Sequence, residues 1–486
     1  MKMSSKLIFE MSSVGRTGYR FPDIDVPVLP LDKQIKSSLL RKSKPNLPEV
    51  SEVDIIRHYS SLSKKNFGVD AGFYPLGSCT MKYNPKINED VGNFSGFSGI
   101  HPLQSEESVQ GFLEMLYETT KSLCEITGMK WGTLQPYAGA HGEYTGMKFF
   151  KSYFRKKGEL NRTKVLVPTS AHGTNPASAT IAGFHIEEIQ ADERGLVSVE
   201  SLKKHLTDDV AGIMLTNPNT LGLFEKDIIE IAKLVHDAGG LLYYDGANMN
   251  AIMGKVRPGD MGFDVIHLNL HKTMSTPHGG GGPGSGPVLV SDRLVDFMPT
   301  PDVKKNDDGY YFDYNIPDTM GRVAGFYGNI AVLVRAYAYI ITMGSDGLKK
   351  ASEYAVLNAN YLKERLKKTY HLYYDTTCMH EFVLSAKKLK EEYGISALDI
   401  AKGLLDHGYH PPTIYFPPIV PESMMIEPTE TESKETLDGF VETMLDIYQL
   451  AVNDPEKLHE APLHTAVRRV DEVLAVKQPI LKWHAE

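Results

Sequence analysis

The first candidate for covalent chemistry in this chain is a lysine at the end of an apolar run. Lys272 lies in NLHKT (269–273), and a loop of extreme glycine content, HGGGGPGSGP (278–287), follows it. A lysine amine removed from water is harder to protonate and therefore becomes a nucleophile. A glycine-rich loop can wrap an anion. Together they favour a Schiff base with an aldehyde cofactor that carries phosphate, and pyridoxal 5'-phosphate (PLP) is the obvious candidate.

An aspartate 27 residues earlier could tune the electronics of such a site. Asp245 ends the apolar run LLYY (241–244), and GAN (246–248) lets the chain turn away. A carboxylate at this point could pair with the pyridinium nitrogen, which keeps the ring protonated and electron-withdrawing. The alternative is that Asp245 only caps the turn. We favour the cofactor role because Lys272 ends the next apolar strand, as neighbouring positions on one sheet edge require.

A turn of small residues is the candidate phosphate site. Gly139, Ala140 and His141 lie in QPYAGAHGE (135–143), ahead of a helix predicted to start near Tyr144. Small residues let backbone N–H groups approach an anion, and a helix N-terminus adds a favourable dipole. Many turns are rich in glycine and alanine, so the motif gains meaning only from its position.

Two further loops follow predicted strands. His172 follows the run KVLVP (164–168), and its imidazole could stack flat on a pyridine ring, although a lone histidine is more often structural. Asn217, in TNPNT (216–220), could bond to the phenolic oxygen of the cofactor or to the substrate. It could equally form an Asx turn that stabilises its own loop.

The remaining unusual segments carry no clear chemistry of their own. The segment FYPLGSCTMKYN (73–84) has no metal-ligand spacing, and no metal is expected; Cys79 in it is interpreted as a small packed residue rather than a nucleophile. The glycines after His278 could approach a phosphate closely or admit a substrate. The alternative is a flexible surface loop. Ordering four consecutive glycines is entropically expensive, so an accidental tract of this kind is not expected.

Composition narrows the class of protein. The chain has 486 residues, of which 42% are hydrophobic and 23% charged, so a large core is available. A formal charge of −9 argues against a nucleic-acid binder. Three dispersed cysteines, the lack of a signal-like start and the lack of a long apolar stretch predict a cytoplasmic protein with no membrane association.

The candidate residues need a parallel sheet to bring them together. A helix is predicted over 105–127 and another over 228–238, and short apolar strands over 164–168, 211–216, 241–245 and 264–268. Such alternation is typical of an α/β fold with a mostly parallel sheet covered on both faces. Ligands bind at the carboxyl ends of strands in these sheets.

The rest of the chain predicts further units. Helices over 327–343, 349–368, 396–407 and 430–453 and a strand near 381–384 indicate a smaller α+β domain. The expected divisions are 1–104 as an N-terminal arm and extended segment, 105–325 as the large cofactor-binding domain, 326–453 as the small domain, and 454–486 as a tail. The proline-rich arm either wraps a partner subunit or packs on its own domain.

These motifs together resemble a known family. The segments that carry the resemblance are GFYPLGSCTMKYNPKINE (72–89), QPYAGAHGE (135–143), SAHGTNPASA (170–179), YDGANMNA (244–251) and NLHKTMSTPHGGGGPGSGP (269–287), with LIFEMSSVGRTGYRFP (7–22) and VRRVDEVLAV (467–476) at the ends. They are similar to the glycine dehydrogenase (decarboxylating) family, the P-protein of the glycine cleavage system. The resemblance covers essentially the whole chain and is closest to the C-terminal half of the single-chain form.

The resemblance implies a PLP-dependent fold type I enzyme of the aspartate-aminotransferase-like kind. It implies subunit 2 of a split P-protein, paired with a subunit 1 as a dimer of heterodimers. Glycine would lose carbon dioxide, and its aminomethyl group would pass to the lipoyl arm of H-protein. The residues so placed are Lys272 as the Schiff-base lysine, Asp245 at the ring nitrogen, His172 on the ring face, Gly139, Ala140 and His141 at the phosphate, and Thr276 in the cofactor-site wall.

Other interpretations stay open from the residues alone. Another fold type I enzyme, such as an aminotransferase, a desulfurase or an amino-acid decarboxylase, would share the lysine and the aspartate. A desulfurase needs a mobile catalytic cysteine, which no convincing loop supplies. An aminotransferase usually has a carboxylate-binding arginine in its small domain, and residues 370–450 contain none. A non-catalytic assembly subunit is the alternative of a different class.

Overall fold

The computed structural model describes residues 6–279, 282 and 284–483. Part of the predicted glycine loop, residues 280, 281 and 283, lies outside the described residues, as do residues 1–5 of the predicted signal-free start. The chain forms two compact units, Met1–Gly68 with Pro462–Glu486, and Val69–Ala461. The predicted domain boundaries at 104, 325 and 453 stay predictions.

The first unit contains short helical elements joined by extended chain. Its elements are η1 Ile8–Met11, α1 Leu31–Gln34, η2 Ser37–Leu39, α2 Glu52–Ser63 and α16 Glu472–Lys477. No helical element before residue 50 of the described chain exceeds four residues, as the many prolines predict. The longest element, α2, begins where the Ser51 hydroxyl accepts a hydrogen bond from the backbone N–H of Asp54 at 3.2 Å.

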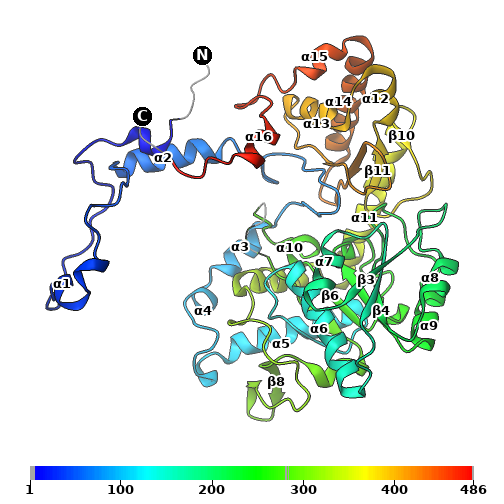
Figure 1. The fold of residues 1–486 in the computed structure, drawn as a ribbon, viewed down its shortest axis with the longest axis horizontal. Helices are drawn as coiled ribbons and strands as arrows, with labels where there is room; N and C mark the ends of the chain where they lie inside the picture. The colour runs from blue at the N-terminus through cyan, green and yellow to red at the C-terminus, as the bar shows by residue number, and fades with distance from the viewer. Residues whose placement is uncertain (1–5, 280–281, 283, 484–486) are drawn as a thin grey trace. The chain divides into compact units, whose positions relative to one another are not determined.

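The second unit is built on a seven-stranded sheet of mostly parallel strands (Figure 1). The strands are β1 Trp131–Thr133, β2 Lys164–Pro168, β3 His185–Ile189, β4 Val210–Thr216, β5 Leu241–Gly246, β6 Val265–Leu268 and β7 Val288–Val290. Their order is β1-β7-β6-β5-β4-β2-β3, and only the pairs that involve β7 are antiparallel. The predicted parallel sheet is therefore confirmed.

Alternate residues of the central strands enter two different cores. Leu242 and Tyr244 of β5 belong to one hydrophobic cluster, whereas Leu241 and Tyr243 belong to another. Because successive side chains of a strand point to opposite faces, both faces of the sheet are covered. A sheet buried on both sides exposes only its strand ends, which leaves the carboxyl edge as the place for polar loops.

Helices and short connections surround this sheet. They are α3 Lys86–Gly92, α4 Ser95–Ser98, η3 Glu106–Ser108, α5 Gln110–Thr127, α6 Gly139–Lys157, α7 Thr174–Ile181, α8 Val199–His205, α9 Ile228–Asp237, η4 Met249–Ala251, η5 Pro258–Met261, α10 Leu270–Thr273 and η6 Asp292–Phe297, with a β-hairpin of β8 Asp302–Asn306 and β9 Gly309–Asp313. The helix predicted from 105 begins at Gln110 instead, after a separate turn of 3-10 helix.

A smaller antiparallel sheet lies in the C-terminal part of the same unit. Its strands are β10 His371–Leu372, β11 Phe382–Ser385, β12 Thr413–Ile414 and β13 Ser423–Ile426, and its helices are α11 Ile330–Leu366, α12 Lys387–Tyr393, α13 Ala397–Asp406, α14 Lys434–Asn453 and α15 Pro455–His459. The predicted α+β arrangement is confirmed. The two helices predicted over 327–343 and 349–368 correspond to the two parts of α11, which are separated by a kink at Gly344, where a φ of 61° breaks the helical geometry.

A buried lysine ties the segment before α3 to the rest of this unit. Lys82 is 2% exposed, and its Nζ donates to Glu430 Oε1 at 2.6 Å and to Asn250 Oδ1 at 2.8 Å. Burial lowers the pKa of Lys82, but Glu430 and Tyr339 together raise it by more, so the lysine stays charged. These contacts join η4 and the loop before α14 to the segment that leads into the cavity described below.

Lys82→Met is expected to lower the free energy of unfolding by about 3 kcal/mol, because it leaves the Glu430 carboxylate buried without its counter-ion. Denaturant unfolding measures the change. Lys86→Met is the control: Lys86 pairs with Asp70 at 2.7 Å on the surface, and its loss should change stability by less than about 1 kcal/mol. Equal effects of the two substitutions would contradict the conclusion that the buried ion pair of Lys82 stabilises this unit.

Among the helices of the described residues, none combines the length and apolarity needed to cross a membrane.

Candidate active site

A cavity of about 340 Å³ opens at the carboxyl edge of the large sheet. The lining residues are Leu76, Ser78, Cys79, Gly139, Ala140, Glu143, His172, Thr174, Thr216, Thr220, Asp245, Ala247, Asn248, His267, Asn269, His271, Lys272 and His278. They come from the ends of β2, β4, β5 and β6, from α6 and from the segment before α3. The loops predicted to meet at one sheet edge therefore do so, because the strands that precede them are parallel neighbours.

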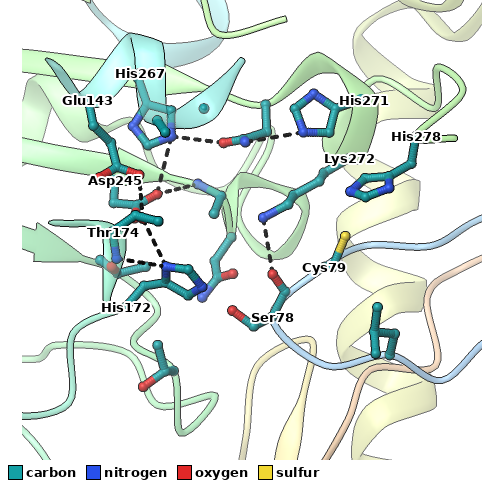
Figure 2. A pocket seen from close by; sticks show the side chains of 18 residues that line it. Ser78, Cys79, Glu143, His172, Thr174, Asp245, His267, His271, Lys272 and His278 are labelled. Atoms are coloured by element: carbon teal, nitrogen blue, oxygen red, sulfur yellow. Dashed lines mark hydrogen bonds and ion pairs between the residues drawn. The ribbon is translucent and has the colours of Figure 1, made fainter. Parts of the chain in front are cut away.

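Lys272 points into this cavity from a short helix rather than from a strand end. The strand β6 ends at Leu268, and Lys272 lies one turn later in α10. The side chain is half-buried, not buried as the apolar run before it indicated, and its Nζ donates to the Ser78 carbonyl at 3.1 Å (Figure 2). The cavity thus contains the amine that the sequence predicted, with a backbone acceptor that the sequence did not reveal.

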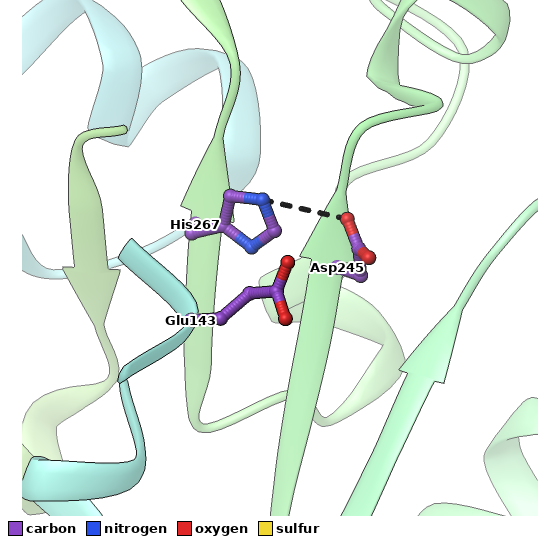
Figure 3. Close-up of side chains that lie close together, drawn as sticks. All are labelled: Glu143, Asp245 and His267. Atoms are coloured by element: carbon purple, nitrogen blue, oxygen red, sulfur yellow. Dashed lines mark ion pairs between the residues drawn. The ribbon is translucent and has the colours of Figure 1, made fainter. Parts of the chain in front are cut away.

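Asp245 is held as a buried carboxylate at the end of β5. Its Oδ2 accepts from Asn175 Nδ2 at 2.9 Å, its Oδ1 accepts from Ala247 N at 3.0 Å, and His267 Nε2 lies 3.4 Å from Oδ1 (Figure 3). Burial raises the pKa of Asp245, but His267, Asn175 and the other donors outweigh burial and lower it. The carboxylate is therefore ionised, as a partner of a pyridinium nitrogen must be.

His172 is linked to the same network through a hydroxyl and a second carboxylate. His172 Nδ1 lies 2.9 Å from Thr174 Oγ1, and that hydroxyl donates to Glu143 Oε1 at 2.7 Å. Asn175 Nδ2 donates to the other Glu143 oxygen at 3.1 Å as well as to Asp245. Figure 2 shows Glu143, His172, Thr174 and Asp245 on the side of the cavity opposite Lys272. The orientation of His172 is thus fixed from the side of α6.

The N-terminus of α6 forms another wall. The helix begins at Gly139, five residues earlier than predicted, and its N-cap residue Ala138 offers no side-chain oxygen to the first turn. Gly139 and Ala140 line the cavity. A Cβ on Gly139 would lie 2.4 Å from Asn269 Nδ2, so a larger residue there would require the Asn269 side chain to move. An uncapped 19-residue helix that opens on a cavity can bind an anion.

His141, Asn217 and Thr276 do not line the cavity. In His141, Nδ1 accepts from Tyr137 N at 3.2 Å and Nε2 lies 2.8 Å from the Val323 carbonyl oxygen, so the ring serves the loop in front of α6. Asn217 is fully buried, and its Oδ1 accepts from Glu225 N at 2.9 Å, which corresponds to the turn-stabilising alternative. Thr276 is 1% exposed.

The residues present fit a phosphorylated aldehyde cofactor. Thr216 Oγ1 and His278 Nδ1 belong to lining residues, are buried, and have no hydrogen-bond partner among the described residues. Burial, and then Lys272, lowers the pKa of His278, so its ring is neutral. The cavity therefore offers two polar groups without partners in the described chain, an uncapped helix N-terminus, an ionised Asp245 and an amine. A phosphate and a pyridine ring would supply partners for these groups.

A group of buried ionisable residues, one histidine and two glutamates, lies next to the segment that carries Ser78. His380, Glu381 and Glu427 have 0–1% exposure, and His380 Nε2 is 3.9 Å from Glu381 Oε1 and 4.0 Å from Glu427 Oε1. Burial raises the pKa of Glu381 to about 8, although the Ser78 N–H and Lys272 oppose this rise. Burial also lowers the pKa of His380 to about 3. The group is therefore largely uncharged at neutral pH.

The free energy of unfolding is expected to fall as the pH rises, because of Glu381. Between its ordinary pKa of 4.5 and about 8, the folded state holds a proton on Glu381 that the unfolded state releases. Stability from this group is complete below 4.5 and is lost as the pH rises through 8. Glu381→Gln should flatten the curve of unfolding free energy against pH in this window. Parallel curves for the two proteins would contradict the raised pKa.

The cysteines do not qualify as nucleophiles. Burial raises the pKa of the Cys79 thiol to about 11, although Lys272 opposes this, and burial raises the pKa of Cys378 to about 12. The protonated thiol is a poor nucleophile, because the thiolate is the reactive form of cysteine. The interpretation of Cys79 as a packed residue agrees with this, although its side chain also lines the cavity.

Sequence reasoning missed Glu143, His267 and the buried ionisable residues. Two signals were available: Glu143 lies inside the motif assigned to phosphate, and His267 is a polar residue within the apolar strand VIHL (265–268). For His380, Glu381 and Glu427 there was no comparable signal, because they approach the cavity only through the packing of the small sheet beside Ser78.

Family models and curated relatives match most of this chain. The family model described as glycine cleavage system P-protein matches residues 27–308, and that described as glycine dehydrogenase, C-terminal domain, matches residues 351–465. A relative from Caldanaerobacter subterraneus subsp. tengcongensis, named probable glycine dehydrogenase (decarboxylating) subunit 2, is 60% identical over 484 residues, 99% of each chain.

Solved structures share the fold. A crystal structure of glycine decarboxylase (P-protein) of the glycine cleavage system, in inhibitor-bound form, matches with a TM-score of 0.70 at 19% identity and covers 86% of this chain and 93% of that one. The apo structure of cysteine desulfurase from Thermococcus onnurineus NA1 matches with a TM-score of 0.61 at 15% identity, covering 78% of this chain and 95% of that one. The fold is fold type I, as predicted.

Proposed function

The chain belongs to the glycine dehydrogenase (decarboxylating) family, the P-protein family of the glycine cleavage system, and we propose that it acts as subunit 2 of that enzyme. In this role it decarboxylates glycine with PLP and transfers the aminomethyl group to the lipoyl arm of H-protein. The observation that carries the proposal is the convergence of Lys272, Asp245 and His172 on one cavity in a chain 60% identical to a relative of that name.

Lys272 is the residue that would hold the cofactor covalently. Its amine reaches the cavity from α10, beside the uncapped N-terminus of α6, where Gly139 and Ala140 would hold a phosphate. When bound, PLP supplies an electron-withdrawing pyridinium ring that stabilises negative charge on the carbon of glycine that loses carbon dioxide. The Ser78 carbonyl holds the amine of Lys272 when that amine is free.

Asp245 and His172 would prepare the site for this chemistry. Asp245 is ionised and buried, so it places a negative charge at the floor of the cavity, where it stabilises a proton on the ring nitrogen. The Thr174 hydroxyl and Glu143 hold His172 in an orientation that lets its ring cover the cofactor. No arginine lines the cavity within the described part of the chain.

The partners follow from the same assignment. The relatives are named subunit 2, which supports a separate subunit 1 as partner and a dimer of heterodimers. Lipoylated H-protein would present its arm at the cavity mouth. The part of the glycine loop next to His278 is the wall most suited to admit such an arm, because His278 lines the cavity where that loop begins.

A desulfurase is the second candidate, since a desulfurase shares the fold. The protonated Cys79 and Cys378 thiols disfavour it. A non-catalytic assembly subunit is disfavoured by the complete set of cavity residues, which such a subunit does not need.

Co-expression with a candidate subunit 1 tests the proposal. The purified complex, supplied with PLP and lipoylated H-protein, should release carbon dioxide from glycine, and borohydride should fix the cofactor to the peptide that contains Lys272. Absence of glycine decarboxylation together with cysteine desulfuration would favour the second candidate. Neither activity, with no cofactor fixed, would favour the assembly subunit.

A further inference from the structure

The segment Leu76–Thr80 is clamped between the cavity and the small sheet. Leu76 forms an antiparallel bridge with Ile426 of β13, and Gly77 N donates to the Met425 carbonyl at 3.2 Å. The Thr413 hydroxyl donates to the Gly77 carbonyl at 2.7 Å. A Cβ on Gly77 would lie 2.6 Å from the Met425 carbonyl oxygen, so the close approach requires glycine. The small sheet therefore fixes where this wall of the cavity lies.

Ser78 has two backbone contacts that face opposite ways. Its N–H donates to Glu381 Oε2 at 2.6 Å, and its carbonyl accepts from Lys272 Nζ at 3.1 Å. Its φ of 62° is in the left-handed region, which a residue other than glycine adopts only when its surroundings hold it there. The N–H and the carbonyl lie in successive peptide planes joined at Ser78, so what holds the N–H restrains the direction of the carbonyl through the dihedral angles of this residue.

Glu381 is fixed independently of Ser78. A Cβ on Gly222 would lie 1.9 Å from the Glu381 carbonyl oxygen, so the backbone of Glu381 packs directly on that glycine. Its Oε1 accepts from Asn248 Nδ2 at 3.5 Å, and Asn248 lines the cavity. The Glu381 side chain is 0% exposed. Keeping a carboxyl group in such a place is costly unless it has a specific partner, and the Ser78 N–H is the shortest of its contacts.

We propose that Glu381 is a positioning residue for Lys272: by holding the Ser78 N–H it aims the Ser78 carbonyl at the lysine amine, so that this carbonyl receives the amine whenever it is not bonded to the cofactor. The proposal rests on the proposed function for the need to release and recapture that amine. His380 lies next to Glu381, with its Nε2 3.9 Å from Glu381 Oε1 and 4.0 Å from Glu427 Oε1.

The raised pKa of Glu381 is compatible with this role. A protonated carboxyl group still accepts a hydrogen bond from a backbone N–H through its carbonyl oxygen, so the contact with Ser78 persists on both sides of pH 8. An amide at the same position offers the same acceptor. Glu381→Gln should therefore retain the positioning, whereas a side chain without an acceptor, as in Glu381→Met, should lose it.

Competitive labelling of lysines in the full-length chain tests the proposal. The protein is co-purified with subunit 1, freed of cofactor with hydroxylamine, and treated with a trace of acetic anhydride; peptide mass spectrometry then gives the rate at Lys272. Lys151 is the internal standard, because its Nζ likewise donates to a backbone carbonyl, that of Gly183, at 2.8 Å. Glu381→Met should label Lys272 roughly two- to tenfold faster than wild type, the factor for loss of one hydrogen bond.

Matched variants separate positioning from general damage to the fold. Glu381→Gln should label like wild type. Glu225→Met is the control, because Glu225 is also a buried glutamate whose Oε2 accepts from a backbone N–H, that of Val197, at 2.8 Å. It should leave the Lys272 rate unchanged. If Glu381→Met does not fold, Glu381→Asp, whose carboxyl is one methylene shorter, takes its place.

The result that overturns the proposal is an unchanged rate at Lys272 in folded Glu381→Met, or the same increase in Glu225→Met. An increase in Glu381→Gln equal to that in Glu381→Met would also overturn it. Because labelling needs neither glycine nor cofactor, these outcomes are independent of whether the complex decarboxylates glycine. The proposed function can fail while the contact is verified, and the converse also holds.

Discussion

Lys272→Ala is expected to lower glycine decarboxylation by the reconstituted complex by roughly 10³- to 10⁴-fold. The Lys272 amine is the group in the cavity that can bond to an aldehyde, and the Ser78 carbonyl holds it at the cavity wall. Alanine removes the covalent anchor and the amine that would move protons during turnover. The measurement is glycine-dependent exchange of labelled bicarbonate, with PLP in excess so that weaker binding alone does not limit the rate.

Lys151→Ala is the matched control, since it also removes a half-buried lysine that donates to a backbone carbonyl. It should leave exchange unchanged. Full exchange in Lys272→Ala, with cofactor still fixed by borohydride to another peptide, would show that the attachment point lies elsewhere.

Asp245→Asn is expected to lower the same activity by roughly 10²- to 10³-fold, the range for removing one preorganised charge from an active site. Asparagine preserves the shape of the side chain but removes the negative charge that would stabilise a proton on the ring nitrogen. It also changes the contact with His267, whose Nε2 lies 3.4 Å from Asp245 Oδ1. Because Asp245 is buried, no solvent charge replaces it. The absorbance of the bound cofactor should shift together with the rate.

The control for Asp245 lies at the other end of the same strands. Asp264 is also buried, and its Oδ2 accepts from Leu242 N at 2.9 Å and lies 2.8 Å from His236 Nε2. Asp264→Asn should reduce stability without the change in cofactor absorbance. If the two substitutions reduced the rate equally at equal loss of stability, the effect of Asp245 would be structural and its assigned role would be wrong.

The order of apolar strands and helices was the most predictable part of this protein. Continuous apolar runs such as LLYY (241–244) are typical of strands buried on both faces, and two separate cores receive their alternate side chains. Helix ends were harder to place. The helix α6 begins at Gly139 because its first turn packs its glycines against Asn269 and the strand β6, a tertiary contact that local propensity does not contain.

The site divides in the same way. Parallel neighbours carry their following loops to one edge, so the meeting of Lys272, Asp245 and His172 was predictable from strand order alone. The direction in which each side chain near these strand ends points could not be predicted. His141 turns to the Val323 carbonyl and Asn217 to Glu225, because each finds a local hydrogen-bond partner away from the cavity.

The sequence by itself determined the fold type and the family, and it predicted the residues for covalent chemistry, because strand periodicity and short motifs can be read directly in the chain. Only the tertiary structure decided what surrounds Lys272. Glu381 and Ser78 are separated by 303 positions, and they meet because the small sheet pairs with the segment before α3. Burial, charge state and the direction of a hydrogen bond are properties of that packing, and no local pattern specifies them.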